Sequence, residues 1–282
     1  MKNIEPLVTV VITTKNEEKN IERLLRSIVA QSYKKLEVVI VDNNSTDRTK
    51  EISKKFTKHV YDMGPERSAQ RNFGAKMAKG GYLLFLDADM ELTPDVVGGC
   101  VRVVITKAQK AVVIPERTVG NGLMARVRQF ERKMYVGDSD IEVARFFDKK
   151  VFSEFDGYDL NLTGPEDFDL PYRIGKKYPI GRSRGYILHH EEEASLGKLL
   201  KKKFYYASKG SRYAEKHPEL VWKQGNLLFR KAYLRNWTNF VKHPFVGAIF
   251  LAVRALETTW AVSGYISVVG LKGFVRTLLI RR

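Results

Sequence analysis

The chain has 282 residues, of which 44% are hydrophobic and 29% are charged. This composition supports a folded core and excludes a generally disordered protein. The single cysteine, Cys100, excludes an intramolecular disulfide and is consistent with a reducing compartment. The first residues, Met1–Pro6, are polar, so the start of the sequence predicts no signal peptide.

The formal net charge of +17 is concentrated in the last third of the sequence. Residues 195–282 contain 17 lysines and arginines but only three acidic residues, whereas residues 1–194 carry a net charge of only +3. A basic tail of this kind indicates an anionic partner, either a membrane surface or nucleic acid. Solubility alone is the alternative explanation.

Short apolar strands alternate with helices through the first part of the chain. The runs that predict buried strands are Val8–Thr13, Leu36–Val41 and Tyr82–Leu86, and Val60–Asp62 is expected as a further short strand. The segments that predict helices are Glu17–Gln31, one after the turn at 42–47 capped by Ser45 or Thr46, and one from Pro65 to about Lys79. Strands that are apolar on both faces are typical of a mostly parallel sheet covered by helices, so we expect an α/β fold.

The same alternation continues to residue 190. Helices are expected at 93–105, Leu123–Tyr135 and Pro165–Lys176, and strands at 111–115, Ala144–Phe152 and Tyr186–Leu188.

The C-terminal third has a different character. Residues 195–216 predict a basic, aromatic helix, and residues 245–271 are largely apolar but are interrupted by Arg254 and Glu257. No uncharged stretch reaches the ~20 residues that span a bilayer. We therefore expect helices that lie on or dip into a membrane, with a buried helical appendage as the alternative.

The sequence Asp87-Ala88-Asp89 follows an apolar strand directly. Alternation along a strand puts both carboxylates on one side, at the edge of the sheet where parallel folds bind ligands. Paired oxygen ligands suit Mg²⁺ or Mn²⁺ with nucleotide phosphates completing the shell. The alternative is that the two acids only cap the helix near Thr93.

Other polar residues are expected at the same sheet edge. Thr13 and Thr14 end the first strand, and Asp42 ends the second. A carboxylate there can accept hydrogen bonds from a base or a ribose, although an Asx turn would explain Asp42 equally well. Arg71 precedes the Asp87 strand and can pair with a diphosphate, whereas an exposed helix charge is the alternative.

Two later pairs are further candidates. Glu166 and Asp167 open a helix, where they either cap it or supply a general base for an acceptor hydroxyl. His189 and His190 end an apolar strand, where a neutral imidazole either binds a metal ion or serves the structure.

These segments together resemble the family-2 glycosyltransferases of the Rossmann-like GT-A fold. The matching segments are Val8–Glu17, Leu36–Asp47, Ser68–Gly74, Tyr82–Asp89 and Gly164–Leu170. The resemblance covers the chain to about residue 190 in order and spacing. It implies a nucleoside diphosphate sugar donor and inversion of the anomeric centre in one displacement.

The resemblance also implies roles for the donor-side residues. Thr13 and Asp42 look like nucleobase contacts, and Arg71 resembles a base or diphosphate contact. Asp87 and Asp89 are similar to the ribose and metal pair, with Asp89 as the direct metal ligand. The residues that the resemblance adds to the donor site are Thr14, Asn16, Glu17, Asn44 and Ala88.

On the acceptor side, the resemblance makes Asp167 the catalytic base and Glu166 its neighbour that positions the acceptor. His189 or His190 falls where some members place a metal-binding histidine, and the sequence does not choose between them.

Three positions depart from the family pattern. Lys15 stands where an aromatic residue is frequent, and Asn43 replaces a frequent second aspartate. The Gln-x-x-Arg-Trp motif of processive synthases is absent, and Lys198–Tyr206 stands in its place. We therefore predict transfer of a single sugar.

The resulting expectation is a glycosyltransferase that uses Mn²⁺ or Mg²⁺ and a donor linked to uridine diphosphate, with guanosine and thymidine carriers left open. Its acceptor would be a glycan, a lipid-linked glycan or another hydroxyl compound, at the inner face of the cell membrane.

The predicted domains are a catalytic domain at 1–194, with a nucleotide-sugar half at 1–92 and an acceptor half at 93–194, and a helical extension at 195–282. The alternatives are a metal-dependent nucleotidyltransferase and a non-catalytic protein that binds a membrane or nucleic acid. The basic residues lie beside apolar runs, which favours a membrane over nucleic acid.

Overall fold

The computed structural model describes residues 5–191, 195–225, 227–228 and 230–279. Most of the polar segment Met1–Pro6 and the proposed boundary at residue 194 therefore lie outside the described residues. The chain forms two compact units. Unit 1 comprises 1–116, 143–160 and 169–190, and unit 2 comprises 117–142, 161–168 and 191–282.

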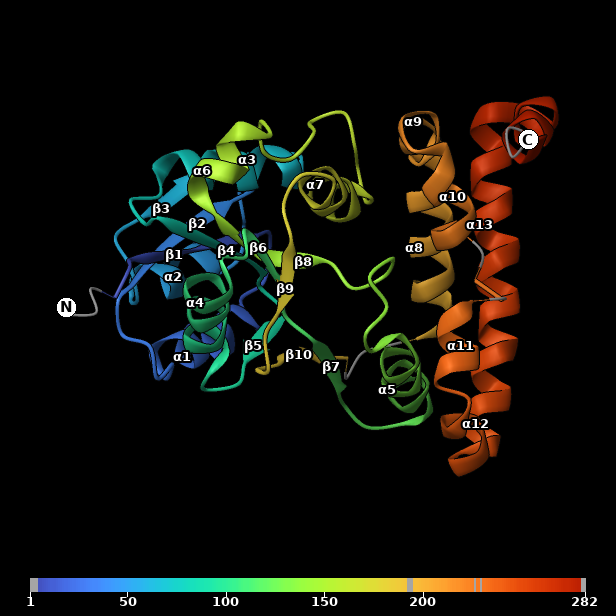
Figure 1. Ribbon diagram of the computed structural model, residues 1–282, viewed down its shortest axis with the longest axis horizontal. Helices are drawn as coiled ribbons and strands as arrows, with labels where there is room; N and C mark the ends of the chain where they lie inside the picture. The colour runs from blue at the N-terminus through green and yellow to red at the C-terminus, as the bar shows by residue number, and fades with distance from the viewer. Residues whose placement is uncertain (1–4, 192–194, 226, 229, 280–282) are drawn as a thin grey trace. The chain divides into compact units, whose positions relative to one another are not determined.

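Unit 1 is built on a seven-stranded sheet in the order β3-β2-β1-β4-β8-β6-β9 (Figure 1). Its first half is parallel, and its strands are β1 (Val8–Thr14), β2 (Leu36–Asp42), β3 (Val60–Asp62) and β4 (Tyr82–Asp87). All four strands were predicted with ends within one residue, β1, β2 and β4 from their apolar runs and β3 as a short strand. The mostly parallel central sheet with surrounding helices confirms the expected fold class.

The other half of the sheet is mixed. Strand β8 (Ala144–Asp148) runs antiparallel to both β4 and β6 (Ala111–Val113), and β9 (Ile180–Arg182) runs parallel to β6. The predicted strand Ala144–Phe152 is wrong beyond Asp148. The Asp148 carboxylate accepts a hydrogen bond from the Lys150 backbone at 2.9 Å and caps helix α6 (Lys149–Glu154), which begins there.

A second, three-stranded sheet has the order β5-β10-β7. Its strands are β5 (Met90–Leu92), β10 (Ile187–His190) and β7 (Glu116–Val119). Strand β10 runs antiparallel to β5, with His189 opposite Met90. This sheet continues from the end of β4, so the residues after Asp87 are held in a fixed register.

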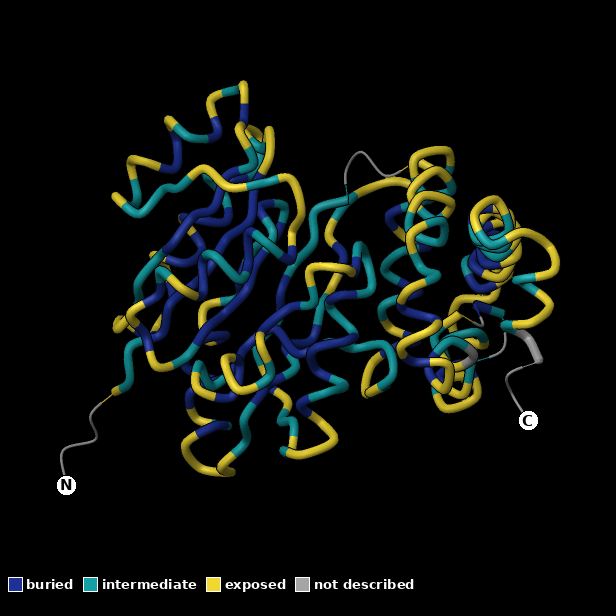
Figure 2. The backbone as a smooth tube through the Cα atoms, turned by 90° about the horizontal axis from the view of Figure 1, so that it is seen from above, coloured by how far each residue is buried: buried dark blue, intermediate teal, exposed yellow. Residues whose placement is uncertain are grey.

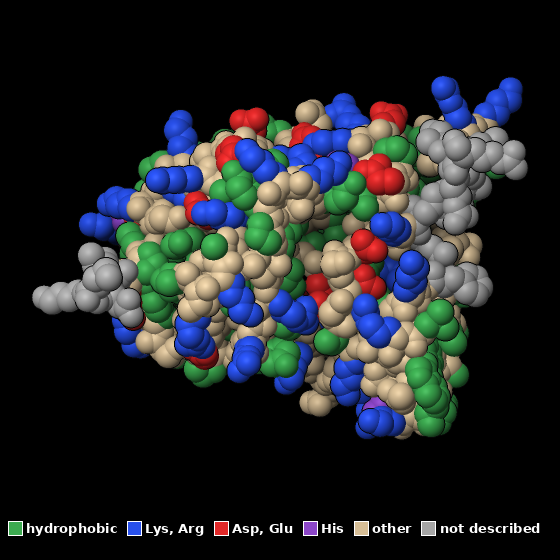
Figure 3. Space-filling model, in the orientation of Figure 1, with side chains coloured by type: hydrophobic (Ala, Val, Ile, Leu, Met, Phe, Trp, Pro, Cys, Tyr) green, Lys and Arg blue, Asp and Glu red, His purple; other side chains and the backbone are tan. Residues whose placement is uncertain are grey.

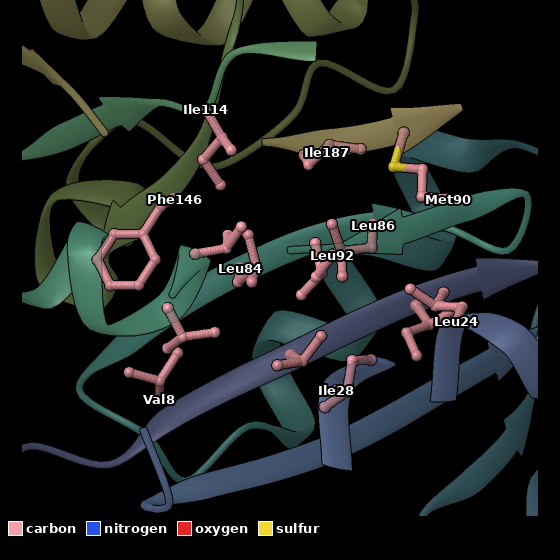
Figure 4. Close-up of a cluster of buried hydrophobic side chains, with 14 of the residues drawn as sticks. Val8, Leu24, Ile28, Leu84, Leu86, Met90, Leu92, Ile114, Phe146 and Ile187 are labelled. Atoms are coloured by element: carbon pink, nitrogen blue, oxygen red, sulfur yellow. The ribbon is translucent and has the colours of Figure 1, made fainter. Parts of the chain in front are cut away.

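Both faces of the main sheet are buried, as the apolar strands predict (Figure 2). On one face, Leu84 and Leu86 pack against Leu24 and Ile28 of α1 (Figure 4). The helices on this face are α1 (Ile21–Val29), α2 (Thr49–Lys54) and α4 (Val96–Lys107). The other face is covered by α3 (Arg67–Met77), α6 and the unit 1 part of α7 (Glu166–Gly175).

Two helices begin later than their sequence signals suggest. Helix α1 starts at Ile21 rather than Glu17, and α2 starts at Thr49 with Arg48 as its N-cap. The prediction that Ser45 or Thr46 caps this helix is therefore wrong. The Ser45 hydroxyl and backbone N–H are both bound to Asp42 instead.

Unit 2 is helical in the part of the chain that the structure describes, apart from most of β7. Its helices are α5 (Leu123–Tyr135), α8 (Leu196–Ser208), α9 (Ser211–Lys216), α10 (Pro218–Gly225), α11 (Lys231–Arg235), α12 (Thr238–Lys242) and α13 (Pro244–Leu279). The predicted helix at 195–216 is broken at Lys209-Gly210, and α13 is kinked at Gly270, where φ is +72°.

The contacts group segment 117–142 with the C-terminal helices rather than with the sheet. Val127 and Phe130 of α5 share an apolar core with Tyr233 of α11 and Phe250 of α13. Segment 161–168 also belongs to unit 2. This grouping differs from a division at residue 194, because the apolar face of α5 is buried by helices that follow it by about 100 residues in the sequence.

Candidate active site

The carboxyl ends of three parallel strands bring polar side chains together at one edge of the main sheet. In the register of β1 with its neighbours, Thr14 is paired with Asp42 and Thr13 with Asp87. The two threonines and two aspartates that the sequence places at this edge are therefore neighbours across adjacent strands.

Asp87 is held by three side chains at this edge. The Thr13 hydroxyl donates to Asp87 Oδ1 at 3.1 Å, and Arg71 Nη2 donates to the same oxygen at 3.1 Å. Arg145 Nη1 of β8 lies 3.7 Å from Oδ2. Burial alone would raise the pKa of Asp87, but the charges of Arg71 and Arg145 outweigh it and hold the pKa well below its usual value. Asp87 is therefore a fixed carboxylate anion.

Helix α3 packs closely against strand β1 at Gly74, and this contact places Arg71 at the sheet edge. A Cβ at Gly74 would lie 2.3 Å from a Val11 methyl carbon, so a larger residue would push the helix off β1. Arg71 lies one helical turn before Gly74, on the same face. Its guanidinium is almost fully buried and lies 5.1 Å from the centre of the Tyr158 ring. The alternative that Arg71 is an exposed charge on the helix surface is therefore wrong.

Asp42 forms the Asx turn that its sequence context allows. Its fully buried carboxylate accepts the Ser45 backbone N–H at 2.6 Å and the Ser45 hydroxyl at 2.5 Å. Asn16 has φ of +53°, and its side-chain oxygen accepts the Thr46 backbone N–H at 2.9 Å. Asn44 also lies in the left-handed region, with φ of +51°. These residues fix the two loops that follow β1 and β2.

The turn after β4 carries the second aspartate. Within the described residues, the Asp89 side chain makes no hydrogen bond or ion pair, whereas Ala88 before it is buried. Burial raises the pKa of Glu17 above its usual value, and the nearby charge of Asp89 adds to the shift. The turn thus carries a carboxylate that is unengaged within the described residues, and a carboxylate oxygen is the kind of ligand that a hard divalent cation takes.

The two histidines of β10 face opposite sides of the small sheet, as successive strand residues do. His190 Nε2 lies 2.6 Å from Glu91 Oε2, and the register of β10 with β5, continued by one residue, places His190 opposite Asp89. His189 Nε2 lies 3.1 Å from Glu116 Oε2. The His189 Nε2 atom is buried and makes no hydrogen bond of good geometry within the described residues.

Glu116 connects His189 to the Asp87 cluster. Arg145 Nε donates to Glu116 Oε1 at 2.9 Å, while its Nη1 faces Asp87. Arg145, Glu116 and Glu91 were not among the predicted site residues. Glu91 could have been found from the alternation Asp87-x-Asp89-x-Glu91, because alternate residues of a strand lie on the same side. Arg145 and Glu116 come from strands whose pairing the sequence does not reveal.

Asp87, Asp89 and His189 provide ligand types that a divalent cation accepts. Two carboxylates of one turn and a buried imidazole nitrogen without a hydrogen bond are suitable ligands. In the described part of the chain, no three side chains of His, Cys, Asp or Glu form a complete metal cluster. A cation bound here would need further oxygen ligands, such as the phosphates of a nucleotide.

Glu166 and Asp167 lie in the first turn of α7, as predicted, in a segment that belongs to unit 2. The preceding Gly164 has φ of +101°, and a Cβ there would lie 2.5 Å from Tyr206 of α8. Arg212 of α9 donates to the Asn161 side-chain oxygen at 3.2 Å. The segment that carries both acids is therefore held by the C-terminal helices, whereas Thr13, Asp42, Arg71, Asp87 and Asp89 belong to unit 1.

Comparison with known proteins agrees with this architecture. Residues 9–156 match the family model of glycosyl transferase family 2. A β-1,3-glucosyltransferase of Campylobacter jejuni, which acts on GalNAc(5)-diNAcBac-PP-undecaprenol, is 29% identical over 164 residues, covering 53% of this chain and 50% of the relative. Glycosyltransferase AglE of Haloferax volcanii is 37% identical over 98 residues, covering 32% of each chain. The chain thus matches half or less of the length of these relatives.

Solved structures share the fold at low sequence identity. The mannosyltransferase PcManGT of Pyrobaculum calidifontis, in complex with GDP-Man and Mn²⁺, superposes with a TM-score of 0.61 at 17% identity, covering 99% of this chain and 89% of that one. TarS of Staphylococcus aureus, residues 1–349, gives a TM-score of 0.57 at 17% identity, covering 93% and 90%. The family match spans more than half of the chain, and this excludes the nucleotidyltransferase and non-catalytic alternatives. The chain belongs to glycosyl transferase family 2 and is a glycosyltransferase of the GT-A fold.

Proposed function

We propose that the chain transfers a single sugar from a nucleoside diphosphate sugar to a hydroxyl group of a glycan or a lipid-linked glycan, with inversion. The observation that carries this proposal is the sheet edge where Thr13 and Arg71 both donate hydrogen bonds to Asp87. A TarS structure in complex with UDP-GlcNAc supports a uridine donor, and the GDP-Man complex of PcManGT keeps guanosine as the second choice.

On the donor side, the loops after β1 and β2 provide the nucleotide site. Thr13, Thr14 and Asp42 would contact the base, after the Asp42 carboxylate gives up part of its bond to Ser45. Arg71 would stabilise the negative charge that develops on the leaving diphosphate, because a buried guanidinium interacts strongly with phosphate oxygens. The loop residues Asn16, Glu17, Asn44 and Ala88 would complete the walls of the site.

A divalent cation, Mn²⁺ or Mg²⁺, would be held by Asp89 as the direct ligand, with Asp87 and one of His189 and His190 beside it. When bound, such an ion neutralises charge on the diphosphate. Asp87 is already neutralised by Arg71 and Arg145, which leaves Asp89 as the stronger ligand. We propose that Asp87 mainly orients the ribose.

On the acceptor side, Asp167 would take the proton of the acceptor hydroxyl and Glu166 would position that hydroxyl. The acceptor oxygen forms a bond to the anomeric carbon as the bond from that carbon to the diphosphate oxygen breaks. The proton moves to Asp167 and the electron pair leaves with the nucleoside diphosphate. One displacement suffices, so no covalent sugar–enzyme intermediate forms.

We also propose a place for the enzyme in the cell. The relative in Campylobacter jejuni acts on an undecaprenol-linked glycan, and a lipid-linked acceptor would bring this chain to a membrane. The catalytic domain, proposed as residues 1–194, would act at the inner face of the cell membrane in the synthesis of an envelope glycan. The basic extension at 195–282 would contact anionic lipid rather than nucleic acid.

The variant Asp167→Asn tests the mechanism. We expect it to bind the donor nucleotide as the wild type does, in calorimetry with Mn²⁺, and to lose about 100-fold or more in turnover. Asp95→Asn, at an exposed position of unit 1, is the matched control and should keep full turnover. Parallel losses of nucleotide affinity and turnover in Asp167→Asn would show that this residue is not the base.

A further inference from the structure

Up to its kink at Gly270, helix α13 has buried charges, and many of its large apolar side chains are exposed. Between residues 244 and 271 the sequence contains only two charged residues, Arg254 and Glu257. Both are essentially fully buried in unit 2. Arg254 Nη1 donates to Glu131 Oε1 of α5 at 2.7 Å, and Arg254 Nη2 forms an ion pair with Glu257. The two charges therefore mark the side of α13 that faces the protein.

The opposite side of α13 is exposed, and it is uncharged over residues 244–271. Its large exposed side chains include Phe245 (72%), Leu256 (39%) and Trp260 (40%). Trp237 at the N-cap of α12 and Val241 of α12 add to it, and Figure 3 shows hydrophobic side chains gathered over α12 and the adjoining end of α13. A surface helix in water normally shows the reverse arrangement, so this face fits an apolar environment.

Positive charges flank this face. Residues 231–279 contain one acidic residue, the buried Glu257, so the exposed charges in this part of the chain are all cations. They are Lys231, Arg235 and Lys242 before or at the start of α13, and Lys272 and Arg276 beyond its kink. Two copies of such a surface would repel each other, whereas an anionic lipid leaflet matches both the charge and the apolar strip.

Helix α13 is long and apolar enough, by length and composition alone, to cross a membrane. Its partner helix argues against a crossing. A Cβ at Gly264 would lie 2.3 Å from the Phe204 carbonyl oxygen, so α8 is packed tightly along α13. A crossing helix would carry the exposed Lys201 and Lys202 of α8 into the bilayer, which translocon scales penalise strongly.

We infer that the outer face of α11–α13 is a docking surface for an anionic phospholipid leaflet, with α13 lying in the plane of the membrane rather than across it. The inference rests on the proposed membrane contact and names the surface that makes it. Leu256 and Trp260 enter the boundary between headgroups and acyl chains, while the cations at 231–242 and 272–276 contact lipid phosphates.

Co-sedimentation of the full chain with vesicles tests the surface. We expect binding to phosphatidylglycerol-containing vesicles and little binding to pure phosphatidylcholine. The double variant Leu256→Glu/Trp260→Glu should lose more than ten-fold in partitioning. The variant Lys272→Gln/Arg276→Gln should lose roughly 30-fold, about five-fold for each cation. The matched control is Ile105→Glu, an exposed apolar position of α4 in unit 1, and should bind normally.

The depth of two positions separates the in-plane arrangement from a crossing. Positions 245 and 260 are about 22 Å apart along a helix. We compare two single-tryptophan variants, in both of which Trp222 and Trp237 are replaced by phenylalanine. The first keeps Trp260, and the second carries Phe245→Trp together with Trp260→Phe. We expect equal quenching of the two by bromine-labelled lipids. A depth difference of roughly 20 Å would overturn the in-plane arrangement.

The remaining outcomes separate this inference from the proposed function. If the wild type does not bind anionic vesicles, the proposal of a membrane contact is itself wrong. If the Leu256/Trp260 variant binds like the wild type, this surface is wrong. A dimer in light scattering that the same variant dissociates would assign the face to a second copy. Nucleoside diphosphate binding, measured in each variant, reports separately on the donor site and should be unchanged.

Discussion

The buried ion cluster between α5, α8 and α13 makes a sharp prediction about stability. The guanidinium of Arg254, which is 1% exposed, contacts Glu131 and Glu257. Glu257 is fully buried, and its next cation, Lys203 Nζ, lies 3.8 Å from it. Replacing Arg254 by methionine keeps most of the side-chain volume but leaves Glu257 with this one distant partner. Removing one member of a buried pair costs about 3–5 kcal/mol, so Arg254→Met should lower the free energy of unfolding of unit 2 by that amount.

The companion variant removes both members of the pair. In Arg254→Met/Glu257→Leu the orphaned carboxylate is gone, and Glu131 still has Arg128. We expect this double variant to recover to within about 1–2 kcal/mol of the wild type, because apolar replacements of buried ion pairs are often neutral. Arg235→Met is the control, since Arg235 is half exposed and its ion pair with Asp138 contributes less than about 1 kcal/mol.

Tryptophan fluorescence during urea unfolding measures these effects directly, since all three tryptophans lie in the sequence after residue 190 and report on unit 2. Equal slopes of the free energy against urea would allow the midpoints to be compared. A loss below about 1 kcal/mol for Arg254→Met, or a double variant less stable than the single one, would refute the role of the cluster.

Three further predictions concern single positions. Gly164→Ala should lower turnover at least ten-fold with unchanged donor binding, because its Cβ would collide with Tyr206 at a φ of +101° and displace the acceptor-side segment. Arg145→Met should weaken donor nucleotide binding by roughly ten-fold in calorimetry, because Asp87 loses one of the two arginines that orient it. Burial would raise the pKa of Glu131, but Arg128 and Arg254 lower it to about 2, so the stability that this carboxylate contributes above pH 5 should be lost as urea midpoints are followed from pH 5 towards pH 2.

Each of these predictions has a control or a contrary outcome. Gly197→Ala, where a Cβ meets nothing within 4 Å, should leave turnover intact. Normal turnover in Gly164→Ala would separate the acceptor segment from α8. Unchanged nucleotide affinity in Arg145→Met would show that Arg71 alone fixes Asp87. Constant urea midpoints between pH 5 and pH 3 would exclude a strongly paired Glu131.

The sequence was sufficient to predict the strands that carry the proposed donor site. Strand β4 and, after Glu37, strand β2 are apolar runs because both faces of the sheet are buried, and the two strands end at Asp87 and Asp42. Helix α5 was predicted to the residue because its apolar spacing is regular. The strand at 144–152 was predicted too long, because Phe152 is apolar for a different reason: it packs from α6 against the second face of the sheet.

The remaining features depend on pairing between distant segments. The strands β5, β7 and β9 have only three or four residues each, which is too short for a periodic signal. Arg145 and Glu116 join the site only because β8 lies beside β4 and β7 lies beside β10. The Asx turn at Asp42 also required coordinates to be seen, since an Asx turn and a nucleotide contact use the same residue type.

The measurement that tests the central claim most directly is release of nucleoside diphosphate from a panel of UDP-, GDP- and TDP-sugars, with and without Mn²⁺ and a lipid-linked glycan acceptor. The account predicts release with one donor class, dependent on the divalent cation, increased by the acceptor, and lost in Asp167→Asn and Asp89→Ala. Release that persists in both variants, or no release with any donor by a folded protein, would contradict the assignment of this sheet edge as the transfer site.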